Sequence, residues 1–209
     1  FVAIYRWTHT STYSRRLAFW LAIGIPFQGV IGGITVITDL NPWVVSLHLI
    51  LSMGLVVAST VLLTHVRSTP PADGVAVRSP HFRFVMAAYL VLLVAIYLGT
   101  IVTGSGPHAG DADAPRNGLN PETWSKLHAW TIWIFVALLL VALWKLRGER
   151  SFKAAVWVLI ATLAQGLIGY VQYFNDLPIA LVAAHLVGAS VLLSLATWLR
   201  LQVQSSRST

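Results

Sequence analysis

Six runs of apolar residues, each about as long as a bilayer is thick, make up most of this 209-residue sequence. A helix needs about 20 apolar residues to cross the hydrocarbon core, and backbone groups in lipid must be paired within their own segment. We place the runs at residues 17–38, 43–64, 84–103, 127–146, 154–174 and 178–199. Only 10% of the residues are charged, against roughly 25% in a soluble domain. The predicted fold class is therefore an all-α, polytopic integral membrane bundle.

The net charge of +7 is explained by membrane topology better than by a nucleic-acid partner. When the segments between the runs are assigned alternately to two sides of the membrane, twelve of the fourteen Lys and Arg residues fall on one side. The other side holds Arg116 and Lys126. Because cytoplasmic segments carry the excess of Lys and Arg, we predict a multi-pass membrane protein with a cytoplasmic C-terminus and no bound nucleic acid.

Two segments 137 residues apart have similar sequences: residues 28–49 (QGVIGGITVITDLNPWVVSLHL) and residues 165–186 (QGLIGYVQYFNDLPIALVAAHL). Nine of the 22 aligned residues are identical. The identities include polar and glycine pairs, namely Gln28/Gln165, Gly29/Gly166, Gly32/Gly169, Asp39/Asp176 and His48/His185. Each segment is predicted to be the end of one helix, an outer turn and the start of the next helix. An internal repeat in a membrane protein predicts two pseudo-symmetric halves with sites at equivalent places.

The two halves are predicted to differ in completeness. Residues 84–199 are expected to form a complete four-helix bundle, and residues 1–64 the end of the first half. Residues 65–83 are expected to be a cytoplasmic connector, residues 104–126 a long outer loop, and residues 200–209 a cytoplasmic tail. The opening residues FVAIYRW are interpreted as the cytoplasmic end of a helix that begins upstream, in a parent protein of eight helices.

Three of the seven histidines, His48, His128 and His185, are predicted to lie inside spans at a similar depth near the outer ends. An ionisable side chain in a membrane is costly and is a functional candidate by default. The alternative for each is a neutral imidazole that bonds to a neighbouring helix. The other four lie in polar segments, where a structural or solvated role is expected: His9, His65, His81 and His108. For His108, in the outer loop, contact with a bound group is the alternative.

Haem is the cofactor that these histidines fit best. The predicted spans contain no carboxylate, which argues against a zinc site and a proton relay. Haem needs one or two axial imidazoles and an apolar slot. His128 and His185, on the second and fourth helices of the complete bundle, are predicted to ligate one iron from opposite faces. Arg116 and Lys126 are candidate partners of the haem propionates. The repeat predicts a second haem site with His48 as one ligand.

The stretches GGITVITDLNPWVVSLH, GTIVTGSGPHAGD and QGLIGYVQYFNDLPIALVAAH resemble, in order and spacing, signature stretches of the haem A synthase family, and are closest to its actinobacterial members. The resemblance covers essentially the whole sequence. It implies eight helices in two pseudo-symmetric four-helix bundles. It also implies an enzyme of the cell (inner or plasma) membrane that oxidises the C8 methyl of haem O to a formyl, giving haem A for terminal oxidases. Haem O is then expected to be delivered by haem O synthase.

Carried over to this sequence, the resemblance implies that His128 and His185 are the axial ligands of a haem b and that His48 is an axial ligand of the substrate haem. The family's catalytic Glu, near the start of its second helix, has no counterpart here and is expected upstream of Phe1. Glu122 lies in the other half and is not a candidate. These 209 residues alone are therefore expected to be inactive. The electron donor and a possible homo-oligomeric state are left open.

Two other functions are compatible with these residues. A non-catalytic b-type cytochrome of the membrane would relay electrons and would need no exchangeable haem, whereas the synthase must admit haem O and release haem A. A haem-free transporter built from repeats is the third alternative. The lack of carboxylates in the predicted spans and the histidines clustered near the outer side argue against a transporter.

Overall fold

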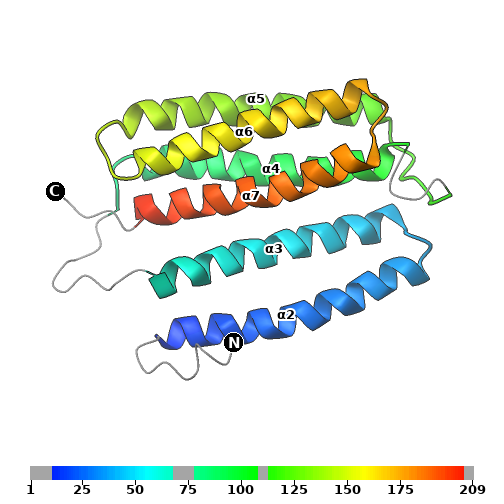
Figure 1. The fold of residues 1–209 in the computed structure, drawn as a ribbon, viewed down its shortest axis with the longest axis horizontal. Coiled ribbons are helices and arrows are strands. Elements are labelled where there is room, and N and C mark those ends of the chain that lie inside the picture. The colour runs from blue at the N-terminus through cyan, green and yellow to red at the C-terminus, as the bar shows by residue number, and fades with distance from the viewer. Residues whose placement is uncertain (1–10, 68–77, 108–112, 205–209) are drawn as a thin grey trace.

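The computed structural model describes residues 11–67, 78–107 and 113–204, and this part of the chain contains helices and no strand (Figure 1). Its long helices are α2 (Thr12–Ile37), α3 (Pro42–Arg67), α4 (Phe82–Ser105), α5 (Pro121–Lys145), α6 (Phe152–Phe174) and α7 (Ile179–Gln204). All six are long and apolar enough to cross a membrane. The predicted class, an all-α polytopic membrane bundle, is confirmed.

Polar capping residues extend several helices beyond the predicted apolar runs. Ser11 Oγ accepts the backbone N–H of Ser14 at 3.1 Å before α2, and Asn120 Oδ1 accepts that of Thr123 at 2.9 Å before α5. Such caps satisfy N–H groups that the first helical turn leaves unpaired. Helix α5 therefore begins at Pro121. The predicted outer loop of residues 104–126 is wrong at its end, because its last residues belong to α5.

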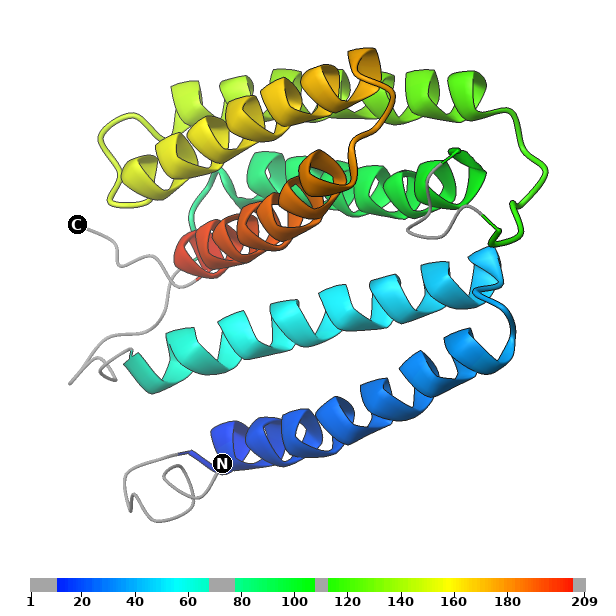
Figure 2. The ribbon, with the colours of Figure 1, turned by 45° about the vertical axis from the view of Figure 1, so that its right-hand side comes forward.

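Helices α4, α5, α6 and α7 form a four-helix bundle in which each helix contacts the next and α7 contacts α4. Helices α5 and α7 do not contact each other in the described structure, so they are diagonal. Helix α3 packs outside this bundle against α4 and α7, and α2 packs against α3 (Figures 1 and 2). Helix α2 thus lies at the edge of the described structure, with side chains such as Trp20, Val30 and Ile37 largely uncovered by protein.

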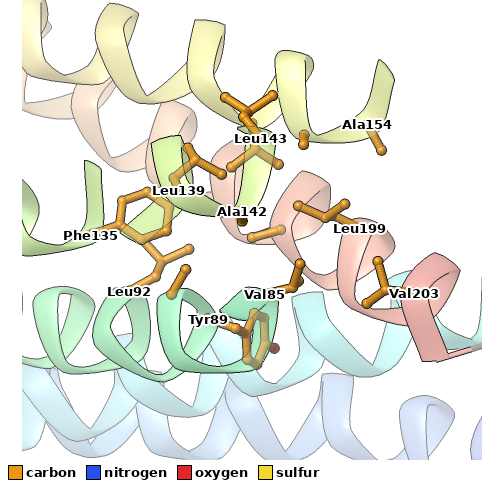
Figure 3. Packing of buried hydrophobic residues seen from close by; sticks show 14 of the residues in the cluster. Val85, Tyr89, Leu92, Phe135, Leu139, Ala142, Leu143, Ala154, Leu199 and Val203 are labelled. Carbon is orange, nitrogen blue, oxygen red and sulfur yellow. The ribbon is translucent and has the colours of Figure 1, made fainter. Parts of the chain in front are cut away.

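The tightly packed core of the α4–α7 bundle joins side chains from all four helices (Figure 3). Leu92, Phe135 and Leu139 are each 1% exposed. In the same core, Tyr89 of α4 and Thr197 of α7 share a hydrogen bond of 3.1 Å between their hydroxyl oxygens. Because lipid is as apolar as the core, close packing and hydrogen bonds between helices hold such a bundle together.

The two ends of the helical array differ in charge. At the end where α5 and α7 finish and α6 begins, on the left of Figure 1, lie nearly all the cations of the described residues. Arg116 and Lys126 lie at the opposite end, next to the start of α5. This asymmetry agrees with the predicted alternation of the segments.

Candidate functional site

Two turns of the same shape lie between α2 and α3 and between α6 and α7, at the end opposite most of the cations, which we call the outer end after the side predicted from the sequence. In the first, the Leu40 N–H donates to the Thr35 carbonyl at 2.8 Å, and in the second the Leu177 N–H donates to the Gln172 carbonyl at 2.8 Å. Each turn has two consecutive non-glycine residues with positive φ, of 51–57°. This conformation is uncommon outside glycine. Each of these features recurs at an offset of 137 residues. The two turns therefore connect their helices with the same backbone conformation.

The three histidines predicted inside spans lie at similar places in their helices. His48 is six residues after the start of α3, His185 six after the start of α7, and His128 seven after the start of α5. All three helices begin at the outer end, so the imidazoles lie about two turns from it. All three side chains are half-buried.

A glycine of the preceding helix faces each of these imidazoles. A β-carbon added to Gly99 of α4 would lie 3.4 Å from Cε1 of His128. The equivalent distances are 3.4 Å from Gly169 of α6 to His185 and 3.5 Å from Gly32 of α2 to His48. The glycines therefore let each ring lie directly against a neighbouring backbone. Sequence reasoning missed this role for Gly99, whose ring partner is distant in the chain.

Hydrogen bonding distinguishes the three rings. Nδ1 of His128 lies 2.9 Å from the carbonyl oxygen of Ala95. A carbonyl can only accept, so we assign the proton to Nδ1, which leaves the Nε2 lone pair available for a metal. Nδ1 of His48 and Nδ1 of His185 are buried and have no hydrogen-bond partner among the described residues. These are the nitrogens that a bound group or its surroundings would have to satisfy.

The α4–α7 bundle is closely packed at one end, whereas at the level of His128 and His185 three of its four helices are less covered by protein. The first buried residue of α5 is Thr131, the last of α6 is Gln165, and the first of α7 is Leu192. Beyond these residues, toward the outer end, the three helices have no buried side chain. His128 and His185 stand on the diagonal helices α5 and α7 at this level. The donor set and the open packing fit a planar apolar group held between two imidazoles.

The other predicted site residues lie apart from this pair. His48 is on α3, outside the four-helix bundle, and faces α2. Arg116 Nη2 donates to the carbonyl of Pro107 at 2.6 Å, and Lys126 forms a 2.5 Å ion pair with Glu122 on the surface of α5. Both cations are at the same end as the histidines, and their contact with propionates stays a prediction.

The remaining histidines have local partners where the structure describes them. Nδ1 of His65 lies 2.9 Å from the Val61 carbonyl oxygen, and Nε2 of His81 lies 3.8 Å from Oε1 of Glu149. This agrees with the structural role expected for both. His9 and His108 lie outside the described residues.

No group of three or more His, Cys, Asp or Glu side chains able to hold a metal ion occurs in the described ranges. Two hollows lie away from the histidines. One is inside the core beside Tyr89 and Phe135, and the other is beside Trp144 and Arg147 near the far end of α5. The site is therefore defined by paired imidazoles and open packing, and these hollows are not part of it.

Comparison with known proteins gives one match. The family model COX15-CtaA, described as a cytochrome oxidase assembly protein, matches residues 1–130. This range includes His48 and His128 and ends before His185. Searches of curated proteins and of solved structures found no match. Because the match covers more than half of the chain and agrees with the resemblance found in the sequence, the protein belongs to the COX15-CtaA family of cytochrome oxidase assembly proteins, the haem A synthase family.

Proposed function

We propose that this protein is a haem A synthase, which oxidises the C8 methyl of haem O to a formyl and so produces haem A. The observation that carries the proposal is the position of His128 and His185, at one depth on diagonal helices, where α5, α6 and α7 have no buried side chain. The two imidazoles would hold a haem b there, and this haem would supply one-electron transfer.

The residues around this pair would orient its ligands. The carbonyl of Ala95 holds the proton of His128 on Nδ1, so the lone pair of Nε2 would be available to the iron. Gly99 and Gly169 let the two rings lie against α4 and α6 without a side chain between them. His128 and His185 would thus hold a haem bound between their helices.

The second site would hold the substrate. His48 lies on the helix that corresponds to α7 at the 137-residue offset, and Gly32 faces it as Gly169 faces His185. We therefore assign His48 as an axial ligand of haem O. Arg116 and Lys126, the cations at this end of the described structure, are proposed propionate partners. Haem O synthase would deliver the substrate. Conversion of the methyl to a formyl removes four electrons and adds one oxygen atom, so the reaction would also need an external oxidant that supplies this atom, such as dioxygen, together with an electron donor of unknown identity.

We place the protein in the cell (inner) membrane, and its charge distribution supports one orientation there. If the cation-rich end faces the cytoplasm, the C-terminus is cytoplasmic and the histidines lie toward the outer side. Lipid would then cover the apolar side chains of α2 and α5 that protein leaves exposed.

The test is production of the whole protein in a host that makes haem O but no haem A, followed by extraction and chromatographic separation of haems B, O and A. Haem A should appear only in cells that contain the protein. Purified protein with a low-spin b-type haem and no haem A in the host would contradict the synthase and favour the electron-relaying cytochrome.

A further inference from the structure

Gln165 bridges α6 to the backbone of the proposed ligand His185. Its Nε2 donates to the His185 carbonyl oxygen at 2.8 Å, and the residue is only 8% exposed. A helical carbonyl normally accepts one N–H from its own helix, so this carbonyl receives an additional donor from a neighbouring helix. A hydrogen bond between helices at this point restrains rotation of the turn that carries the imidazole.

The position of Gln165 depends on Gly188, three residues after His185. A β-carbon at Gly188 would overlap Oε1 of Gln165. The amide therefore occupies the space that any other residue at position 188 would fill. Oε1 is buried and has no hydrogen-bond partner among the described residues, so close contact with Gly188, together with the one bond from Nε2, holds the amide in place.

The counterpart at the 137-residue offset is looser. Nε2 of Gln28 lies 3.5 Å from the His48 carbonyl, at the limit of a hydrogen bond, and Gln28 is only half-buried. The position equivalent to Gly188 is Leu51, so the glycine beside Gln165 has no counterpart beside Gln28. The same glutamine and histidine thus make a close bond in one helix pair and a weak one in the other.

We propose that Gln165, placed by Gly188, is a positioning residue that makes the His185 site retain its haem. The proposal rests on the proposed function, in which this site keeps a permanent haem while the His48 site must exchange one. An orienting partner behind a metal ligand strengthens the site, and a ligand that is held in its bound orientation loses less entropy when it binds. The weak hydrogen bond from Gln28 to the His48 carbonyl suits a site that must exchange its haem.

The test compares three variants of the whole protein purified with its haem. Gly188→Ala pushes Gln165 away, Gln165→Met keeps the side-chain length but removes the donor, and Gly166→Ala is the matched control, because a β-carbon at Gly166 meets no atom within 4 Å. The first measurement is the rate of haem transfer from the ferric protein to excess apomyoglobin. The second is the low-temperature EPR signal, which depends on the relative orientation of the two imidazole planes.

Gly188→Ala and Gln165→Met should each speed transfer about fivefold, the factor that corresponds to the net loss of one hydrogen bond. Each should also shift the EPR signal, while Gly166→Ala matches the unmodified protein. The double variant should be no faster than either single variant, because both remove one contact.

Unchanged transfer and EPR in Gln165→Met would overturn the proposal, even if Gly188→Ala failed to fold. Additive effects in the double variant would also overturn it. A purified protein that contains no haem would instead contradict the proposed function, and this result is distinct from haem that is retained with unchanged kinetics.

Discussion

Ser190 of α7 and Met53 of α3 are 137 residues apart in the chain and touch, with Ser190 Oγ 3.8 Å from Met53 Sδ. The same offset relates the two outer turns and the His48 and His185 positions. Two copies related by a twofold axis meet at equivalent residues only along that axis. We interpret this contact as the place where the axis of an internal repeat passes between α3 and α7. The repeat would then put one proposed haem ligand on each of the two central helices.

The bond between Tyr89 and Thr197 is expected to stabilise the bundle. Tyr89→Phe removes the hydroxyl and leaves that of Thr197, which is 0% exposed, without this partner. The free energy of unfolding in detergent should fall by about 1 kcal/mol, as for other hydrogen bonds between membrane helices. Tyr97→Phe is the control because Tyr97 is 50% exposed. Equal losses in both variants would mean that the Tyr89 bond contributes nothing specific.

Removal of the His48 imidazole should impair the proposed substrate site and leave the proposed haem b site unchanged. His48→Ala should leave the haem at His128 and His185 intact and lower haem A formation on the order of a hundredfold, because small errors in substrate position are that costly. Extraction of haems from cells with the whole protein measures haem A directly, and the spectrum of the purified protein measures the other haem. Normal haem A production would refute the assignment of His48.

A larger side chain at Gly99 should press on the His128 ring. A β-carbon there already meets Cε1 at 3.4 Å, so the further methyls of Gly99→Val have to displace the imidazole. Haem binding should weaken about tenfold, since overpacking commonly costs about 1–3 kcal/mol. Gly54→Val is the matched control, because no atom lies within 4 Å of its added β-carbon. Equal haem content in the two variants, determined by titration, would contradict the ring position.

The proposed topology can be checked by labelling, because the chain has no cysteine of its own. Asp176→Cys in the α6–α7 turn should react with a membrane-impermeant maleimide from outside the cell. Arg150→Cys, between α5 and α6, should react only after the membrane is permeabilised. If both cysteines react from the same side, the alternating arrangement of six spans is incorrect.

The sequence was sufficient for the properties that depend on local chemistry. Apolar length predicted the six helices, and the positions of His48, His128 and His185 in their runs predicted a common depth. The sequence could not predict the contacts between helices, because these contacts depend on how the helices cross. Ala95 and Gly99 contact His128 from a different helix, and no residue near them in the chain indicates this contact.

The matched glutamines show the same limit. Gln28 and Gln165 are identical residues at equivalent positions of the repeat, but this identity did not predict what their side chains contact. Only the structure shows that each approaches the carbonyl of the histidine twenty residues later. The two distances, 3.5 and 2.8 Å, differ, and the segments also differ at a third position, which is Leu51 in one and Gly188 in the other.

The central claim is that His128 and His185 ligate one haem from opposite faces. Low-temperature EPR of the oxidised whole protein, unmodified and as His185→Ala, tests this most directly, because two imidazoles make ferric haem low-spin and loss of one makes it high-spin. The account predicts a low-spin signal in the unmodified protein and its replacement by a high-spin signal, or loss of that haem, in His185→Ala. A fully retained low-spin signal in His185→Ala would contradict it.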